Sequence, residues 1–133
     1  MPQENVETVR ELNAAFNRDP ADTQAWLHFY DPEVEFHMPP EWPEERLYRG
    51  WDGLRDIVSR MTEVFGSYRW EGARLLDADD RVVGLWHHRG QVEGGPVLER
   101  EVGTVFYFRG NRIIRVLGFF SWREALEAAG LRE

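Results

Sequence analysis

Residues 68–120 decide the fold, and they read YRWEGARLLDADDRVVGLWHHRGQVEGGPVLEREVGTVFYFRGNRIIRVLGFF. Apolar residues recur in this stretch with a period of two, which is typical of β-strands. The pattern breaks at Asp79-Asp80, at Gly94-Gly95-Pro96 and at Gly110-Asn111, where the residue types tolerate turn dihedrals. We therefore expect an antiparallel meander of four strands, at residues 68–78, 81–93, 97–109 and 112–120.

The residues on either side of this stretch have mostly helical periodicity. Apolar residues spaced by three or four predict helices over residues 4–18 and 50–66. The pair Asp19-Pro20 predicts the start of another helix, which Asp31-Pro32 ends. A capping box at residues 121–124 predicts a last short helix.

Between the second and third of these helices, residues 34–38 alternate in character and predict a short strand, followed by a loop with Trp42, Pro43 and Tyr48. The whole pattern predicts an α+β domain with three N-terminal helices, a long sheet and a short C-terminal helix. Long strands twist and curl, so the sheet is expected to curve and to enclose a space against the helices.

The composition fits a single soluble globular domain, residues 1–133. Hydrophobic residues make up 42% and charged residues 30% of the chain, so a folded core is expected. The formal net charge of -8 disfavours nucleic acid and membranes as partners. The chain has no cysteine, and no signal peptide or membrane span is recognisable. We therefore expect a cytoplasmic protein and infer no cofactor.

Aromatic residues form 14% of the chain, and six of them are tryptophans. Such side chains line partly open cavities as well as cores. The composition alone therefore favours a binding cavity and a densely filled core equally.

Five ordered pieces of the sequence carry a family resemblance. They are Asp31-Pro32-Glu33-Val34-Glu35-Phe36, Trp42-Pro43-Glu44, Tyr48-Arg49-Gly50-Trp51-Asp52-Gly53-Leu54, Phe108-Arg109-Gly110-Asn111-Arg112-Ile113-Ile114 and Glu124-Ala125-Leu126-Glu127-Ala128-Ala129-Gly130-Leu131. Together they resemble the SnoaL-like branch of the nuclear transport factor 2-like superfamily, over almost the whole chain. The resemblance implies a cone-shaped, strongly curved sheet around the helices, a deep apolar pocket and often a homodimer. It does not imply one function, because isomerases, cyclases, epoxide hydrolases, dehydratases and binding subunits share this scaffold.

The resemblance also implies positions for catalytic groups. Enzymes similar to ketosteroid isomerase have a carboxylate base at the end of the first strand, and the matching position here is His37, which could still transfer a proton near neutral pH. Their two proton donors match Leu12 and Thr104. Leucine cannot donate a proton, so ketosteroid isomerase activity is disfavoured.

Strand parity predicts which side chains face the pocket. If Thr104 faces inward, so do Val102, Phe106 and Phe108, and in the last strand Ile114, Val116, Gly118 and Phe120 take the inner face. His88 shares a face with Trp86, so we expect His88 rather than His87 to face inward as the second catalytic candidate. In the preceding strand, Tyr68, Trp70 and Arg74 share a face. The predicted pocket residues are Trp42, Tyr48, Trp51, Tyr68, Trp70, Trp86, Thr104, Phe106 and Phe120.

Each candidate also has a structural interpretation. His37 can be a strand-end residue satisfied by water, His88 can hold a structural hydrogen bond, and Trp86 is favoured as core or wall. No spaced histidine pair recurs, so a metal site is not predicted. Residues 99–101 predict a solvated or cross-strand row of charges.

Three functional hypotheses follow. The first is a protein that binds a small apolar or aromatic molecule, such as a polyketide, steroid or terpene. The second is an isomerase, cyclase or dehydratase with His37 as general base and His88 polarising a carbonyl. The third is a non-catalytic dimeric subunit that associates through an apolar patch on the outer face of the sheet, formed by Val83, Leu85, Val105, Tyr107 and Leu117.

Overall fold

The computed structural model describes residues 2–42 and 46–131 of the chain. Helices and strands follow one another in the order α1 (Pro2–Arg18), α2 (Thr23–Leu27), β1 (Tyr30–His37), β2 (Leu47–Arg49), α3 (Gly50–Val64), β3 (Ser67–Ala78), β4 (Arg81–Gln91), β5 (Val97–Arg109), β6 (Arg112–Phe119) and α4 (Trp122–Ala128). None of the helices in these ranges has the length and apolar character that crossing a bilayer requires.

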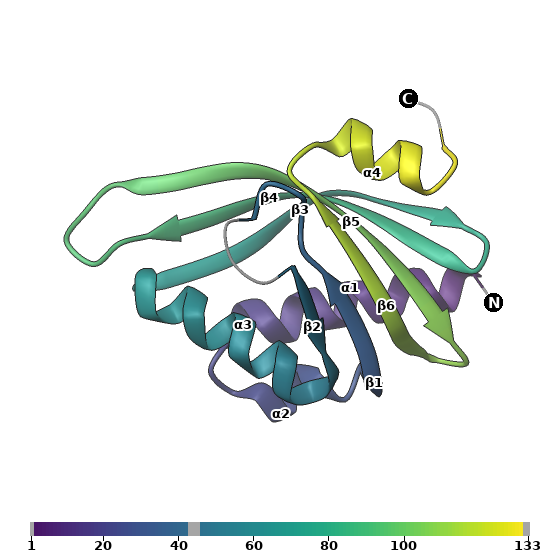
Figure 1. The fold of residues 1–133 in the computed structure, drawn as a ribbon, viewed down its shortest axis with the longest axis horizontal. Helices are drawn as coiled ribbons and strands as arrows, with labels where there is room; N and C mark the ends of the chain where they lie inside the picture. Colours follow the sequence, from purple (N-terminus) through teal and green to yellow (C-terminus); the bar gives the residue numbers. More distant parts are fainter. Residues whose placement is uncertain (1, 43–45, 132–133) are drawn as a thin grey trace.

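The strands form one six-stranded sheet in the order β2-β1-β6-β5-β4-β3. β1 and β6 run parallel, and the other neighbouring strands are antiparallel. Figure 1 shows a twisted sheet with α1, α2 and α3 against one face, here called the inner face, and α4 against the other, the outer face. The predicted α+β class and the meander of β3 to β6 are confirmed. The sheet is open, with β2 and β3 at its edges.

The second helix is shorter than predicted. α2 has only five residues, and Tyr30 already belongs to β1, where it pairs with Ile113 of β6. The backbone nitrogen of Ile113 also donates to the carbonyl oxygen of Phe29 (3.0 Å), so pairing with β6 overrides the local helical periodicity. Asp31-Pro32 does not end a helix but lies inside β1, where the register against β6 shifts between Tyr30 and Glu35.

The loop predicted around Tyr48 contains a short strand. β2 pairs antiparallel with the end of β1, and Tyr48 lies opposite Phe36. Three residues are too few to give a periodicity signal, so the sequence pattern could not reveal this strand. Trp42 belongs to the described part of the predicted loop, whereas Pro43 lies outside the described residues.

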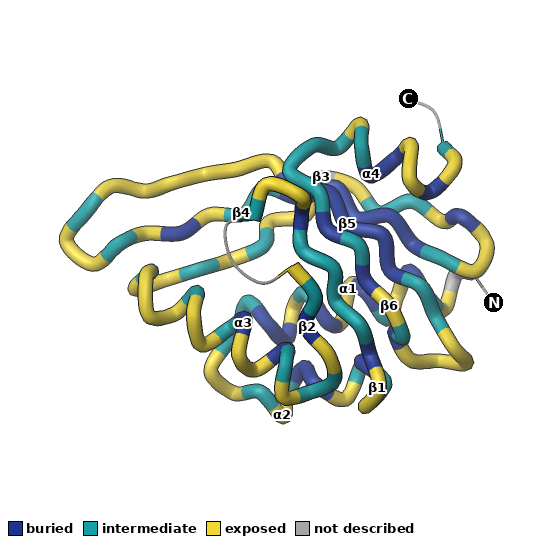
Figure 2. Tube along the Cα trace, viewed as in Figure 1, coloured by how far each residue is buried: buried dark blue, intermediate teal, exposed yellow. Residues whose placement is uncertain are grey.

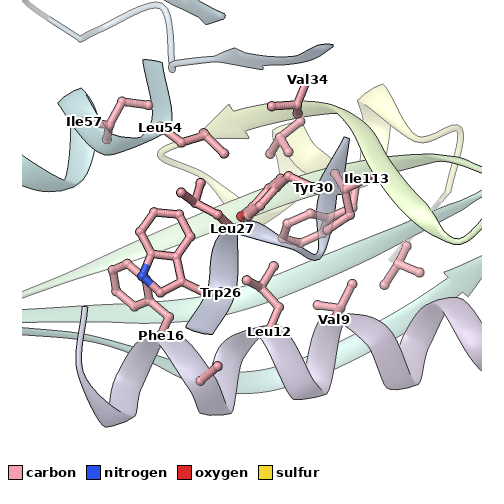
Figure 3. Packing of buried hydrophobic residues seen from close by; sticks show 14 of the residues in the cluster. Val9, Leu12, Phe16, Trp26, Leu27, Tyr30, Val34, Leu54, Ile57 and Ile113 are labelled. Atoms are coloured by element: carbon pink, nitrogen blue, oxygen red, sulfur yellow. The ribbon is translucent and has the colours of Figure 1, made fainter. Parts of the chain in front are cut away.

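The larger core lies between the inner face and the first three helices. Figure 3 shows Leu12 and Phe16 of α1 together with Trp26 of α2, Tyr30 of β1 and Leu54 of α3 in this core. In Figure 2 the buried residues are concentrated in the central strands, whereas the far end of the β4–β5 hairpin is mostly exposed. The apolar stripes of the helices therefore cover only part of the inner face.

A smaller core lies between the outer face and α4. Val83, Leu85 and Val105 are buried there beneath the helix. These three residues, with Tyr107 and Leu117, were predicted to form an exposed interface patch. That prediction is wrong for the three buried residues, because the last helix of the same chain covers them. Tyr107 and Leu117 are partly buried at the margin of this core.

An asparagine of α1 connects this helix to the edge strand β3 through side-chain-to-backbone hydrogen bonds. Asn17 Nδ2 donates to the carbonyl oxygen of Trp70 (2.7 Å), and the backbone nitrogen of Trp70 donates to Asn17 Oδ1 (2.9 Å). Asn13 Nδ2 donates to the same carbonyl oxygen (2.9 Å). These bonds satisfy backbone groups that an edge strand would otherwise leave unpaired.

We expect the substitution Asn17→Ala to lower the free energy of unfolding by about 1–3 kcal/mol, because it leaves the Trp70 backbone nitrogen without its partner in a partly buried place. Urea denaturation followed by tryptophan fluorescence measures the loss. Asn13→Ala is the matched control and should cost less, since Asn17 still binds both Trp70 groups. Equal losses for the two variants would contradict this account of how α1 docks.

Candidate functional site

A cavity of about 420 Å³ lies between the inner face of the sheet and the first three helices. Cavities of this size are typical of small-molecule sites. Apolar side chains form its helix-side wall, among them Phe16 of α1, Trp26 of α2, and Leu54 and Met61 of α3. Residues of β3, β4 and β5 form most of the opposite wall, and polar groups of the cavity, among them His88, Thr104 and Arg100, lie on β4 and β5.

Most of the predicted pocket residues line this cavity. They are Trp42, Tyr68, Trp70, Trp86, Thr104, Phe106 and Phe120, and His88 lines it as well. Tyr48 and Trp51 pack in the larger core and are not among the lining residues. The indole nitrogen of Trp51 donates to the carbonyl oxygen of Tyr30 (3.0 Å), so this side chain ties α3 to the start of β1.

The structure does not bring His37 to the cavity. Phe36 and Met38 face inward and line it, and side chains alternate along a strand, so Glu35 and His37 face outward. His37 Nε2 lies 3.3 Å from Glu35 Oε1, with about a third of the His37 side chain exposed. The base position that the resemblance implied therefore lies on the outer face here, and the inward neighbour is Met38, which cannot transfer a proton.

His88 is positioned by β3 and β4. Trp70 of β3 pairs with His88 of β4, and the two rings stack with centroids 5.6 Å apart and an angle of 8° between their planes. Tyr68, two residues before Trp70 on the same face, forms a hydrogen bond between its hydroxyl and His88 Nδ1. The neighbouring His87 lies on the outer face, where its ring contacts Trp122 (centroids 5.0 Å apart).

Burial determines the protonation state of this pair. It lowers the pKa of His88 to about 3 and raises the pKa of the Tyr68 hydroxyl, so both groups are neutral at pH 7. In the tautomer in which Nδ1 accepts from the Tyr68 hydroxyl, the imidazole proton lies on Nε2. Nε2 is buried and has no hydrogen-bond partner within residues 2–42 and 46–131. In this tautomer the pair leaves a neutral, unpaired N–H donor buried in a residue that lines the cavity.

Two further side chains add polarity to the sheet-side wall. Trp86 Nε1 donates to Thr104 Oγ1 (2.7 Å), which satisfies both groups within the wall. Arg100 lines the cavity and is also exposed, so it lies at the mouth, with its guanidinium carbon 3.7 Å from the centroid of the Phe120 ring. Among the described residues, no three His, Asp or Glu side chains gather in a group suited to a metal ion.

Strand parity predicted the inner faces of β4 and β5 but failed at two β-bulges. In β3 the register shifts between Gly72 and Arg74, which moves Arg74 to the outer face opposite Leu85. The register of β6 against β5 shifts between the β5 residues Tyr107 and Phe108. As a result, Ile113 rather than Ile114 is buried in the larger core.

Sequence reasoning missed Arg100, which it assigned to a solvated charge row. The signal that could have found it was parity, because Arg100 lies two residues before the inward-facing Val102. It also missed most of the helix-side wall, because periodicity identifies the buried stripe of a helix but does not show which part of that stripe faces an empty space.

The open twisted sheet, with three helices on its inner face and a cavity between them, is an α+β arrangement with the fold of a solved nuclear transport factor 2-like protein from Burkholderia pseudomallei. The SnoaL-like domain model matches residues 9–116, so the chain belongs to the SnoaL-like family, as its sequence pieces predicted. No curated protein matches the chain.

Several solved structures have the same fold. Bal32a from a soil-derived mobile gene cassette is 26% identical, with 89% of each chain covered and a TM-score of 0.78. TerC co-crystallised with polyporic acid is 18% identical, with 96% of this chain and 98% of TerC covered and a TM-score of 0.77. A putative SnoaL-like polyketide cyclase from Jannaschia sp. CCS1 is 16% identical, with 98% of this chain and 94% of the other covered and a TM-score of 0.76.

Proposed function

We propose that the protein binds a small, largely apolar molecule with aromatic character in the cavity. The observation that carries this proposal is the cavity itself, about 420 Å³ in volume and lined mainly by aromatic and aliphatic side chains. Transfer of apolar ligand surface from water into such a site contributes about 25 cal/mol per Å² before the costs of association are subtracted. Aromatic walls also favour ring systems, through stacked and edge contacts.

The comparisons support a small organic ligand. TerC, which shares the fold, was crystallised with polyporic acid, and another structure with this fold is described as a putative polyketide cyclase. We extend the polyketide-like class to the present chain as part of the proposal, because Trp70, Trp86 and Phe106 line the cavity with aromatic surfaces.

Binding is better supported than proton-transfer catalysis. The base assigned to His37 lies on the outer face, paired with Glu35. His88 lies in the wall, but its lowered pKa makes it a weak base. Glu99 lines the cavity and is paired with Arg89 (3.3 Å). The isomerase, cyclase or dehydratase hypothesis therefore lacks a positioned base among the described residues, and the homodimer stays a prediction.

Filling the cavity is expected to weaken binding without unfolding the protein. Met61 of α3 lines the cavity, and Met61→Trp places a larger side chain in the empty volume. We expect the affinity for the neutral fluorescent probe N-phenyl-naphthylamine to fall by about ten-fold or more, which corresponds to a loss of about 1.4 kcal/mol of binding free energy. Fluorescence titration measures the affinity, and circular dichroism checks the fold.

The matched control is Val64→Trp on the same helix, because Val64 is 57% exposed and does not line the cavity. This variant should bind the probe as the unmodified protein does. If the unmodified protein shows no saturable binding, or if both variants lose it equally, the cavity is not the binding site.

A further inference from the structure

We propose that the ligand of this cavity is an organic anion whose aromatic body lies among the apolar side chains and whose carboxylate or acidic enol oxygen binds Arg100 at the mouth. The inference rests on the proposed binding function and adds the charge of the ligand to it. Three observations carry it: the position of Arg100 in the sheet, the partners of its neighbours and the hydrogen-bonding character of the wall.

Pairing in the sheet fixes the position of Arg100. Trp70 of β3 is the partner of His88 of β4, which is in turn the partner of Arg100 of β5. The three residues form a cross-strand row on the inner face, and all three line the cavity. The guanidinium packs over the ring of Phe120, which also lines the cavity and holds the charged group beside the apolar volume.

The carboxylates next to Arg100 in the sequence have other partners. Glu99 Oε2 lies 3.3 Å from Arg89 Nε. Glu101 Oε2 accepts a hydrogen bond from the backbone nitrogen of Trp122 at the start of α4 (2.7 Å). Within the described part of the chain, Arg100 has the Phe120 ring as its partner and no carboxylate. Its N–H groups are therefore available to a ligand.

Among the described residues that line the cavity, the buried side-chain polar atoms without a partner are nitrogens. His88 Nε2 and Trp42 Nε1 are buried nitrogens without a partner among the described residues, and both residues line the cavity. With the guanidinium of Arg100, the wall offers N–H groups that need acceptor oxygens. A ligand rich in acceptors and negatively charged at one end satisfies this requirement, whereas a pure hydrocarbon leaves it unmet.

Because the protein carries a net negative charge, binding of an anionic ligand requires a cationic side chain at the site. A formal net charge of -8 repels an approaching anion at long range, so an anionic ligand needs a specific attraction at its site. A guanidinium supplies it through charge-assisted hydrogen bonds to carboxylate or enolate oxygens. The apolar helix-side wall then accommodates the uncharged part of the same molecule.

The experiment compares each anion with its neutral analogue by calorimetric titration at neutral pH and low salt. The pairs are naphthoate with its methyl ester, and 4-hydroxycoumarin, an acidic enol, with coumarin. We expect the anion of at least one pair to bind about ten-fold more tightly than its neutral analogue. The pair that shows this preference identifies the anionic group as a carboxylate or an enol.

The variant Arg100→Gln should reduce the preference to about two-fold or less, because it weakens binding of the anion more than binding of the neutral analogue, and Arg100→Lys should retain part of the preference. Arg115→Gln is the control, because Arg115 lies over Tyr107 on the outer face, away from the cavity. It should keep the full preference.

The outcomes separate the two proposals. If neutral analogues bind as tightly as both anions, the ligand is not an anion, although binding in the cavity stands. If a preference for anions persists in Arg100→Gln, Arg100 is not the recognising group. If neither anions nor neutral compounds bind to the unmodified protein, the proposed binding function itself fails.

Discussion

Replacement of Trp86 by alanine is expected to lower the free energy of unfolding by about 3–5 kcal/mol, the largest effect of any single substitution argued for this chain. Trp86 is only 1% exposed and lies in the middle of β4 on the inner face. Its ring contacts Trp70 (centroids 5.7 Å apart) and Phe106 (6.4 Å), and its nitrogen donates to Thr104. Urea denaturation measures the loss, and Trp86→Phe should lose less because it keeps part of the ring volume.

Two glycines explain how the indole fits between the strands. A methyl group added at Gly84, two residues before Trp86, would lie 2.5 Å from the indole, and one added at Gly72 on β3 would lie 3.2 Å from it. The indole therefore lies flat over Gly84 and reaches Thr104, the β5 partner of that glycine. This close approach requires a residue without a side chain at position 84.

A double-mutant cycle tests this packing. Gly84→Ala alone should cost about 1–3 kcal/mol, because the added methyl group overpacks a rigid buried ring. In the Trp86→Ala background the same change should cost much less, since no indole has to move, so the two losses should not add. Strictly additive losses would show that the glycine and the indole do not compete for the same space.

Most of the fold could be predicted from the sequence because long elements give repeated signals. β3 to β6 contain eight to thirteen residues each, and a period of two is clear over such lengths. The three-residue strand β2 and the start of β1 at Tyr30 depend on pairing with distant residues. No local pattern contains that information.

The candidate site was predicted less well, because a register error of one residue places a side chain on the wrong face of the sheet. The β-bulge in β3 turned Arg74 outward, and the assignment of the first-strand base to His37 missed the inward position by one residue. Trp86, Thr104 and Phe106 were placed correctly, because β4 and β5 pair without a register shift.

The second large effect is a loss of stability in acid that depends on His88. Burial holds the pKa of His88 at about 3 in the folded protein, below the ordinary value of 6.5. Between these two values the unfolded chain binds a proton that the folded protein does not, so the stability falls as the pH falls through this window. The slope approaches about 1.4 kcal/mol per pH unit, and the expected contribution of His88 between pH 7.5 and pH 5 is a loss of about 2 kcal/mol.

The test measures the free energy of unfolding at both pH values in three proteins. In His88→Gln the drop should be smaller by about 2 kcal/mol than in the unmodified protein, because glutamine does not titrate. His87→Gln should keep the full drop, since it changes the neighbouring imidazole on the outer face. The pKa of Asp31 is also lowered, by the hydrogen bond from the Glu33 backbone nitrogen and by Arg109, but this group is present in all three proteins. The comparison therefore isolates His88, and equal drops in the unmodified protein and His88→Gln would show that the folded cavity wall accepts a charged imidazole.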